Sequence, residues 1–423
     1  ASVNDWVQMA FDGTDRSNQK VYIGRNNTFY YEDASKGSFN ADRPTFTFDG
    51  NNQRNARFYL SNRSGSSPAG SSTWENINFG THSYNYTAPT GFGFLNQDTM
   101  TEVDEGKGDF VWSKSRDNTE SHTMYDSSRG VIKQISSNNT TAENTQSDGL
   151  QKFLKGGYQC EEHTRINQSG ISYVSWNWIA NGGTTSANTD GSGASIASTI
   201  QANQTAGFSI VKYTGSGSAG TIAHGLGAAP TFIAAKNLDE SASWYVYINA
   251  TRSANPNTYY MRFDSDDSQT DSGNAWNDTS PTSSVFSVND DKANKSSINF
   301  VAYCWTDIPG YSKVGSFNGN GNAFGPFVYT GFKPKVIIIK GLNIGNNWIV
   351  WDSERSKFNP CDNALYWDLN QAEATSGNDL DILSNGFKAR GTNSNYNGSY
   401  IYGYLAFAEH PFVGSGTNPV TAR

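Results

Sequence analysis

The sequence predicts an all-β fold, arranged as a tandem array of β-sandwich-like modules in which three related repeats follow a partial leading sandwich. Its apolar runs are about four to eight residues long and are bounded by Gly, Asn, Asp, Ser or Pro, as is typical of strands joined by turns. Aromatic residues make up 13% of the chain, and because disordered chains lack them, we expect this one to fold. A cassette that occurs three times sets the number of repeats.

Each copy of the cassette has a strand ending in Lys, an acid or amide followed three residues later by Arg, and a closing strand rich in aromatic residues. The lysines are Lys114, Lys236 and Lys340, and the acid or amide and arginine pairs are Asp126–Arg129, Asn249–Arg252 and Asp352–Arg355. The spacing from Lys to Arg is 15, 16 and 15 residues, and that from Lys to the closing strand is 59, 64 and 64. These spacings predict that the residues are structurally equivalent, and they align Trp178 with Trp305.

Stretches of small residues mark the boundaries between modules. The clearest linker is 181–193, and 307–310 marks the next junction. The predicted domains are a leading segment and three β repeats, which span 1–95, 96–190, 191–310 and 311–423. Domains joined in this way are expected to resemble beads on a short string.

Strands are expected throughout the array, for example at 208–214 and 327–330. In the strand 300–305, Val301, Tyr303 and Trp305 alternate with Phe300, Ala302 and Cys304. Because both sets are fairly apolar, this strand should lie centrally with cover on both faces, and 400–408 should behave likewise.

Helix signals are scarce. The best candidate is 142–155, where Leu150, Phe153 and Leu154 form a partial apolar face. Gly149 interrupts this segment, so at most a short helix is expected there.

Charge and cysteine content exclude several classes of function. The formal net charge is −8, and no run of Lys and Arg supplies the clustered cations that a nucleic-acid surface needs. No apolar run approaches the ~18 residues of a membrane span, so no membrane insertion is expected. The three cysteines are distant from one another and lack a zinc-type spacing.

Three motifs that could carry chemistry have simpler interpretations. The stretch 215–220 matches G-x-G-x-x-G but precedes turn and strand residues, so we read it as a hairpin turn and predict no cofactor. The acidic stretch 264–267 lacks a complete calcium-binding loop and is interpreted as a solvated turn. The stretch 160–163 offers zinc-competent residues whose side chains point in different directions, so no metal is predicted. No catalytic residue is predicted either, because no nucleophile motif is present.

The repeated Lys and Asp/Asn–Arg residues have two interpretations. Acids, amides and Arg can hydrogen-bond sugar hydroxyls beside stacked aromatic rings. Alternatively, they form internal contacts that orient the loop after the Lys strand. We favour the structural interpretation, because binding sites diverge between copies while fold-stabilising contacts persist.

Several stretches of the array resemble one protein family. They are 211–218, 224–230, 280–287, 325–334, 383–391 and 405–412. Together they make 96–423 similar to virion proteins of marine bacteriophages, of the tail or tail-fibre type, which carry tandem β-rich modules behind a concanavalin-like, SPRY-type sandwich.

The leading segment resembles only the second half of that sandwich. The stretches 7–12 and 20–26 look like its central hairpin, and 76–80 and 86–92 look like its end. A half-sandwich leaves a sheet edge unpaired, so we expect that the chain begins inside a longer protein or that another chain completes the sandwich. The first repeat lacks the glycine-rich strand-turn before its Lys strand, which implies a lost or remodelled edge strand.

The resemblance implies a structural, non-enzymatic role in the virion, with host-surface adhesion as the active function. The implied partners are other virion proteins, further copies of the chain in a homo-oligomer, with a trimer favoured, and a host-surface polysaccharide. A capsid-surface or decoration protein and a glycan-cleaving tailspike enzyme stay open as alternatives.

Overall fold

The computed structural model is almost entirely β, with antiparallel sheets and very little helix. It describes residues 7–12, 18–25, 28–31, 35–38, 46–49, 109–154, 157–180, 186–188, 193–250, 255–289 and 291–410. The chain divides into two compact units, 1–102 and 103–423. No helix among the described residues has the length and hydropathy needed to cross a membrane.

The described part of the first unit is a small antiparallel sheet. Its strands are β1 (Val7–Asp12), β2 (Asn18–Arg25), β3 (Thr28–Tyr30), β4 (Lys36–Gly37) and β5 (Phe46–Asp49). Strands β1 and β2 pair with Val7 opposite Arg25, which confirms the predicted hairpin. Strand β2 also pairs with β3 and β5, and Tyr22, Phe29 and Tyr31 form a small buried cluster. The stretches 76–80 and 86–92 lie outside the described residues.

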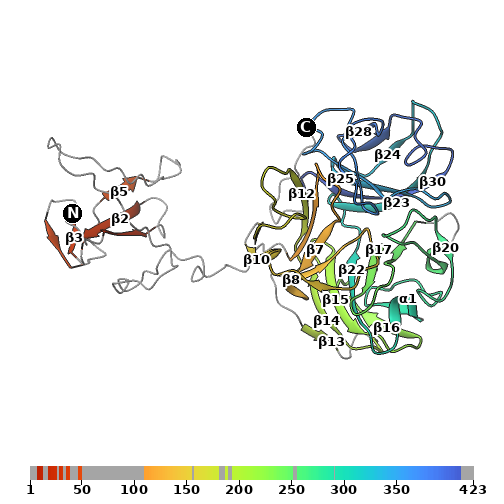
Figure 1. The fold of residues 1–423 in the computed structure, drawn as a ribbon, viewed down its shortest axis with the longest axis horizontal. Helices are drawn as coiled ribbons and strands as arrows, with labels where there is room; N and C mark the ends of the chain where they lie inside the picture. The colour runs from red at the N-terminus through yellow and green to blue at the C-terminus, as the bar shows by residue number, and fades with distance from the viewer. Residues whose placement is uncertain are drawn as a thin grey trace. The chain divides into compact units, whose positions relative to one another are not determined.

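The second unit contains three main sheets, each built mainly from one predicted repeat (Figure 1). The exception is the edge strand Ser186–Asn188, which comes from 96–190 and joins the second sheet. We call 96–190, 191–310 and 311–423 the first, second and third segments. The first sheet has the order β12 (Tyr173–Trp178), β6 (Phe110–Ser115), β7 (Thr123–Asp126), β8 (Gly130–Ile135) and β9 (Asn144–Thr145). Beside it, β10 (Leu150–Leu154) pairs with β11 (Gly157–Cys160).

The second sheet has the order β13 (Ser186–Asn188), β14 (Ser198–Asn203), β15 (Phe208–Thr214), β22 (Asn299–Trp305), β17 (Phe232–Asn237) and β18 (Tyr245–Ile248). Two two-stranded antiparallel sheets accompany it, β16 (Gly220–Ala223) with β21 (Val285–Val288) and β19 (Tyr259–Tyr260) with β20 (Thr270–Asp271). The described helices are one 3₁₀ turn, Pro256–Thr258, and α1 (Asp291–Asn294).

The third sheet has the order β23 (Ser312–Asn318), β30 (Ile401–Ala408), β25 (Pro334–Gly341), β26 (Ile349–Asp352) and β27 (Leu365–Tyr366). A smaller sheet joins β24 (Phe327–Tyr329), β29 (Gly386–Ala389) and β28 (Leu380–Leu383). In all three main sheets the closing strand lies beside the Lys strand, which lies beside the strand that follows it: β12-β6-β7, β22-β17-β18 and β30-β25-β26.

The described parts of the three main sheets differ at the outer edge of the closing strand. Strands β15 and β23 pair with the outer edges of the closing strands β22 and β30. Among the described residues, β12 pairs with β6 alone. The stretch 101–108, on which the expectation of a remodelled edge strand rests, lies outside the described residues.

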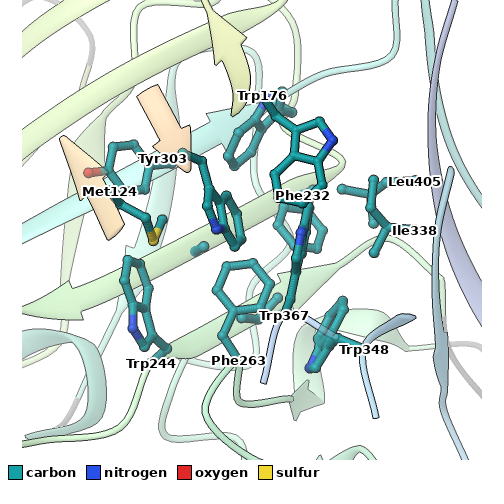
Figure 2. Close-up of a cluster of buried hydrophobic side chains, with 14 of the residues drawn as sticks. Met124, Trp176, Phe232, Trp244, Phe263, Tyr303, Ile338, Trp348, Trp367 and Leu405 are labelled. Atoms are coloured by element: carbon teal, nitrogen blue, oxygen red, sulfur yellow. The ribbon is translucent and has the colours of Figure 1, made fainter. Parts of the chain in front are cut away.

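A central core joins the three segments into one unit (Figure 2). It contains buried side chains from each of them, among which Met124, Trp176, Phe232, Trp244, Ile338, Trp348, Trp367 and Leu405 turn toward one another. The indole rings of Trp112 and Trp367 stack with their centroids 4.0 Å apart, although they come from the first and third segments. The segments therefore share one core and do not form separate beads.

The closing strands of the second and third segments separate this central core from outer clusters. In β22, Val301, Tyr303 and Trp305 face the central core. Phe300, Ala302 and Cys304 belong to an outer cluster of the second segment. Strand β22 is thus covered on both faces, as its sequence predicts. Strand β30 is covered in the same way, with Leu405 in the central core and Tyr404 in an outer cluster of the third segment.

The predicted helix at 142–155 is wrong. The segment forms β9 and β10 instead. A Cβ atom at Gly149 would lie 2.2 Å from the hydroxyl oxygen of Tyr125, so the backbone there passes close to β7. Tertiary packing against the first sheet overrides the weak helical pattern.

Candidate functional site

The three predicted lysines are fully buried. Their ammonium groups donate to main-chain carbonyls: Lys114 Nζ to Asn118 O at 3.1 Å, Lys236 Nζ to Thr140 O at 3.0 Å, and Lys340 Nζ to Asp266 O at 2.8 Å. Burial lowers the pKa of each lysine to about 8, because desolvation disfavours the charged form. For Lys236 and Lys340 the acceptor belongs to the preceding segment.

Two of the predicted acid–arginine pairs form buried ion pairs. Arg129 bonds Asp126 through both its main chain, with N to Oδ1 at 2.8 Å, and its guanidinium. Arg355 does the same with Asp352, with Nε to Oδ2 at 2.5 Å and N to Oδ1 at 2.9 Å. A glutamate completes each group: Arg129 Nη1 lies 3.1 Å from Glu143 Oε2, and Arg355 Nη1 lies 2.7 Å from Glu373 Oε2.

The second segment departs from this pattern. Asp126 and Asp352 lie opposite Phe110 and Val336, each four residues before its lysine. The residue in that position of the second sheet, opposite Phe232, is Ile248, so Asn249 lies one position later. Asn249 donates its main-chain N–H to Thr231 O, as Ser127 and Ser353 do to Asp109 O and Lys335 O. Arg252 lies outside the described residues.

Trp178 and Trp305 occupy matching register positions, opposite Phe110 and Phe232. Phe407 holds the corresponding position of the third sheet, opposite Val336. The three rings meet in the central core, where the ring centroids of Trp178 lie 5.6 Å from those of Trp305 and 5.4 Å from those of Phe407.

A side chain of the next closing strand donates a hydrogen bond to Asp126 and to Asp352. Tyr303 of the second segment donates its hydroxyl to Asp126 Oδ2 at 2.6 Å. Trp176 of the first segment donates Nε1 to Asp352 Oδ2 at 3.3 Å. At the remaining seam, Ile248 and Leu405 share the central core. Ile248 thus occupies the position that the acid has in the other sheets, and Leu405 occupies the position of its polar donor.

A second row of donors links the segments, and our sequence reasoning missed it. His122, Trp244 and Trp348 each lie eight residues after a cassette lysine. Trp244 Nε1 donates to Ser136 O at 2.8 Å, Trp348 Nε1 donates to Arg262 O at 2.7 Å, and His122 Nε2 lies 2.9 Å from Tyr366 O. The constant spacing from the lysines is the signal that could have found them.

Main-chain bonds repeat the same cyclic order. The N–H groups of Glu143, Gln269 and Glu373 donate to the carbonyls of Leu238, Leu342 and Arg116 at 2.9, 3.0 and 2.8 Å. The last of these joins the third segment back to the first. Glu373 reinforces that joint, because its Oε1 lies 2.6 Å from Arg116 Nη2 while its Oε2 contacts Arg355. The first segment thus contacts the second, the second the third, and the third the first.

His122 makes the fold sensitive to acid. Its Nδ1 accepts from Trp112 Nε1 at 2.9 Å, and burial, with the nearby charge of Lys114, lowers its pKa to about 3. Because the unfolded chain protonates His at ~6.5 and the folded protein does not, the stability from neutral His122 is complete above pH ~6.5 and lost as the pH falls below it.

We therefore expect His122→Gln to flatten the fall of unfolding free energy between pH 6.5 and 4, where His122 contributes up to ~1.4 kcal/mol per pH unit. Denaturant titrations at several pH values measure this slope. Burial lowers the pKa of His224 to about 4, so His224 also makes the unfolding free energy fall as the pH falls, in the variant and in the natural protein alike. Burial raises the pKa of Asp368 to about 7, so Asp368 makes the unfolding free energy rise as the pH falls, again in both proteins. An unchanged slope in the variant contradicts the prediction.

The other candidate motifs make contacts within the fold. Within the described ranges, no three His, Cys, Asp or Glu side chains gather closely enough to hold a metal ion. Asp264 accepts from the main-chain N–H of Trp244 at 2.8 Å, and Asp267 pairs with Arg262. The residues after 215–219 form β16, which belongs to a different sheet from β15, so the stretch is a connection between sheets and the predicted hairpin is wrong.

Comparison with known proteins gives one match. A family model described as a domain of unknown function, DUF7483, matches residues 84–411. No curated protein and no solved structure matches the chain.

Proposed function

The chain belongs to the DUF7483 family, and we propose that it is a structural protein of a bacteriophage virion, a tail or tail-fibre component that also adheres to glycans of the host surface. The observation that carries the proposal is the closed cycle of three sheets around one aromatic core. Its buried ionisable groups are bound to one another and to main-chain carbonyls across the seams. Such a unit suits a rigid building block, and the resemblance of 96–423 to virion proteins supplies the setting.

The proposal includes an origin for the fold. The three segments are repeats of one sandwich-like unit, with Lys114, Lys236 and Lys340 in equivalent places. The shared strand order and the three parallel sets of seam contacts support this interpretation.

The proposed partners of the protein are other virion proteins and further copies of the chain, with which it forms a trimer. A capsid-surface position is the second candidate, since a compact, cyclic β unit serves a capsid lattice equally well.

Electron microscopy of the intact particle, with the chain located by a bound antibody fragment, tests the placement. Density at the tail or its fibres is the expected result. Density spread over the capsid shell supports the second candidate, and a particle without the chain overturns the virion role.

The purified protein is expected to release no oligosaccharides from host envelope polysaccharide. The measurement is a time course of reducing ends, with a known polysaccharide hydrolase as the positive control. Reducing ends that accumulate in proportion to protein concentration contradict the structural role and establish the glycan-cleaving alternative.

A further inference from the structure

Exposed aromatic side chains concentrate at one place in the third segment. Six large hydrophobic side chains are exposed among the described residues, and three of them lie within six positions of each other. These are Phe324 at 77%, Phe327 at 48% and Tyr329 at 59% exposure. Large rings of this kind are normally buried, so their clustering on β24 and the loop before it calls for a functional reason.

The rings stand on the outer face of the small sheet β24-β29-β28. Alternation along β24 turns Val328 inward, where it packs with Phe387 and Ile382. It turns Phe327 and Tyr329 outward together. Across the sheet, Phe327 lies opposite Lys388, which lies opposite Asp381, and Tyr329 lies opposite Gly386, which lies opposite Leu383. Opposed residues share a face, so these six positions form one surface, which we call the β24 face.

Gly386 lets β29 pass close to β24. A Cβ atom there would clash with the main-chain oxygen of Val328 and lie 3.0 Å from Cε2 of Phe327, so the ring of Phe327 reaches toward the bare main chain of β29. Phe327 and Tyr329 are two residues apart on one strand, which separates their attachment points by ~7 Å. The face therefore presents two neighbouring exposed rings on one strand.

The charges around the rings are mainly positive. Lys313 Nζ lies 5.6 Å from the ring centroid of Tyr329, and Lys388 stands beside Phe327. The acid on the face, Asp381, is already paired with Arg390, whose Nε lies 3.3 Å from Asp381 Oδ2. Two lysines thus flank the rings without an acid of the face to balance them, on a chain whose formal net charge is −8.

We propose that the β24 face binds an acidic polysaccharide, with sugar rings on Phe327 and Tyr329 and sugar carboxylates at Lys388 and Lys313. The C–H face of a pyranose matches an exposed aromatic ring, and the lysines complement anionic substituents. A protein partner would need about 800 Å² of complementary surface, whereas this face has two rings interrupted by charges. The inference rests on the proposed adhesive role and assigns it a site and a ligand class.

Binding of the complete chain to alginate, a polymer of uronic acids, tests the site, with dextran as the neutral comparison. We expect alginate binding that weakens as salt rises, because the charges are exposed, and much weaker binding to dextran. Phe327→Ala, Tyr329→Ala and Lys388→Gln are each expected to weaken alginate binding by ~10-fold, which corresponds to the loss of ~1.4 kcal/mol. Phe358→Ala removes a ring that is 85% exposed but lies outside the β24 face, and this matched control should bind as the natural chain does.

The outcomes separate this inference from the virion role. Equal alginate binding by the three face variants and by the Phe358 control overturns the site, and equal binding to dextran overturns the acidic ligand. Absence of all binding by a chain that microscopy finds in the tail overturns the inference alone. Alginate binding that depends on Phe327, by a chain absent from particles, overturns the virion role alone. Because the three side chains are at the surface, unchanged thermal unfolding verifies that each variant is folded.

Discussion

Replacing Arg355 by Ala is expected to lower the free energy of unfolding by about 3–5 kcal/mol, the cost of removing one partner from a buried charge group. Its side chain is 2% exposed and bonds Asp352, Glu373 and the carbonyl of Val350. Without it, the carboxylate of Asp352 stays buried in a space from which water is excluded. Chemical denaturation of the variant and of the natural protein at pH 7 measures the difference.

Lys335→Ala is the matched control for this prediction. Lys335 pairs with Glu354, the residue before Arg355, but the side chains of that pair are 34% and 66% exposed. Exposed pairs contribute ~0–1 kcal/mol, so this variant should unfold almost as the natural protein does. Equal losses of unfolding free energy in the two variants would contradict the view that burial of Arg355 causes its large effect. Retained stability of the Arg355 variant with lost binding to host cells would make Arg355 a receptor residue.

A chain that ends at Gly310 is expected to have no fixed tertiary structure. Removing the third segment takes Trp367 from its stack on Trp112 and exposes the central core. It also removes Tyr366 O, the partner of His122. A protein that loses a large share of one continuous core keeps at best a fluctuating, dye-binding state. Near-ultraviolet circular dichroism and binding of an anionic naphthalene dye report this directly.

A chain that begins at Val103 is the control, because residues 103–423 form one compact unit. It should keep the near-ultraviolet spectrum of the second unit and unfold in a single transition. The same C-terminal truncation can be made in this shorter chain, which gives a 103–310 protein. If that protein unfolds cooperatively, the three segments do not depend on a shared core and behave as separate domains.

Much of the local structure could be predicted because strand signals are local. The alternation in 300–305 is enough to show a strand covered on both faces, since each side chain's direction follows from its neighbours. The segment 142–155 was mistaken for a helix because its sequence does not reveal that Tyr125 packs against Gly149. Spacing alone makes Asn249 the equivalent of Asp126 in the second segment. The pairing of β17 with β18 gives the equivalent register position to Ile248 instead.

The site is harder to predict than the strands because its contacts join distant parts of the chain. Tyr303 lies 177 residues from Asp126, and Trp176 lies 176 residues from Asp352. The cassette spacing identifies residues that matter within each sheet. It carries no information on which segment supplies the partner, because that depends on how the three sheets close around their core.

The seam at which Ile248 takes the place of the acid makes the order of the three segments specific. If Leu stood in place of Tyr303 or Trp176, the carboxylate of Asp126 or Asp352 would lose one of its donors. Conversely, a Tyr or Trp in place of Leu405 would bury its polar group in the apolar part of the core that contains Ile248. A buried polar group without a partner is costly, so an incorrect order of neighbours is penalised. During folding, or when several copies of the chain fold close together, this mismatch favours pairing of the right segments and discourages exchange between chains.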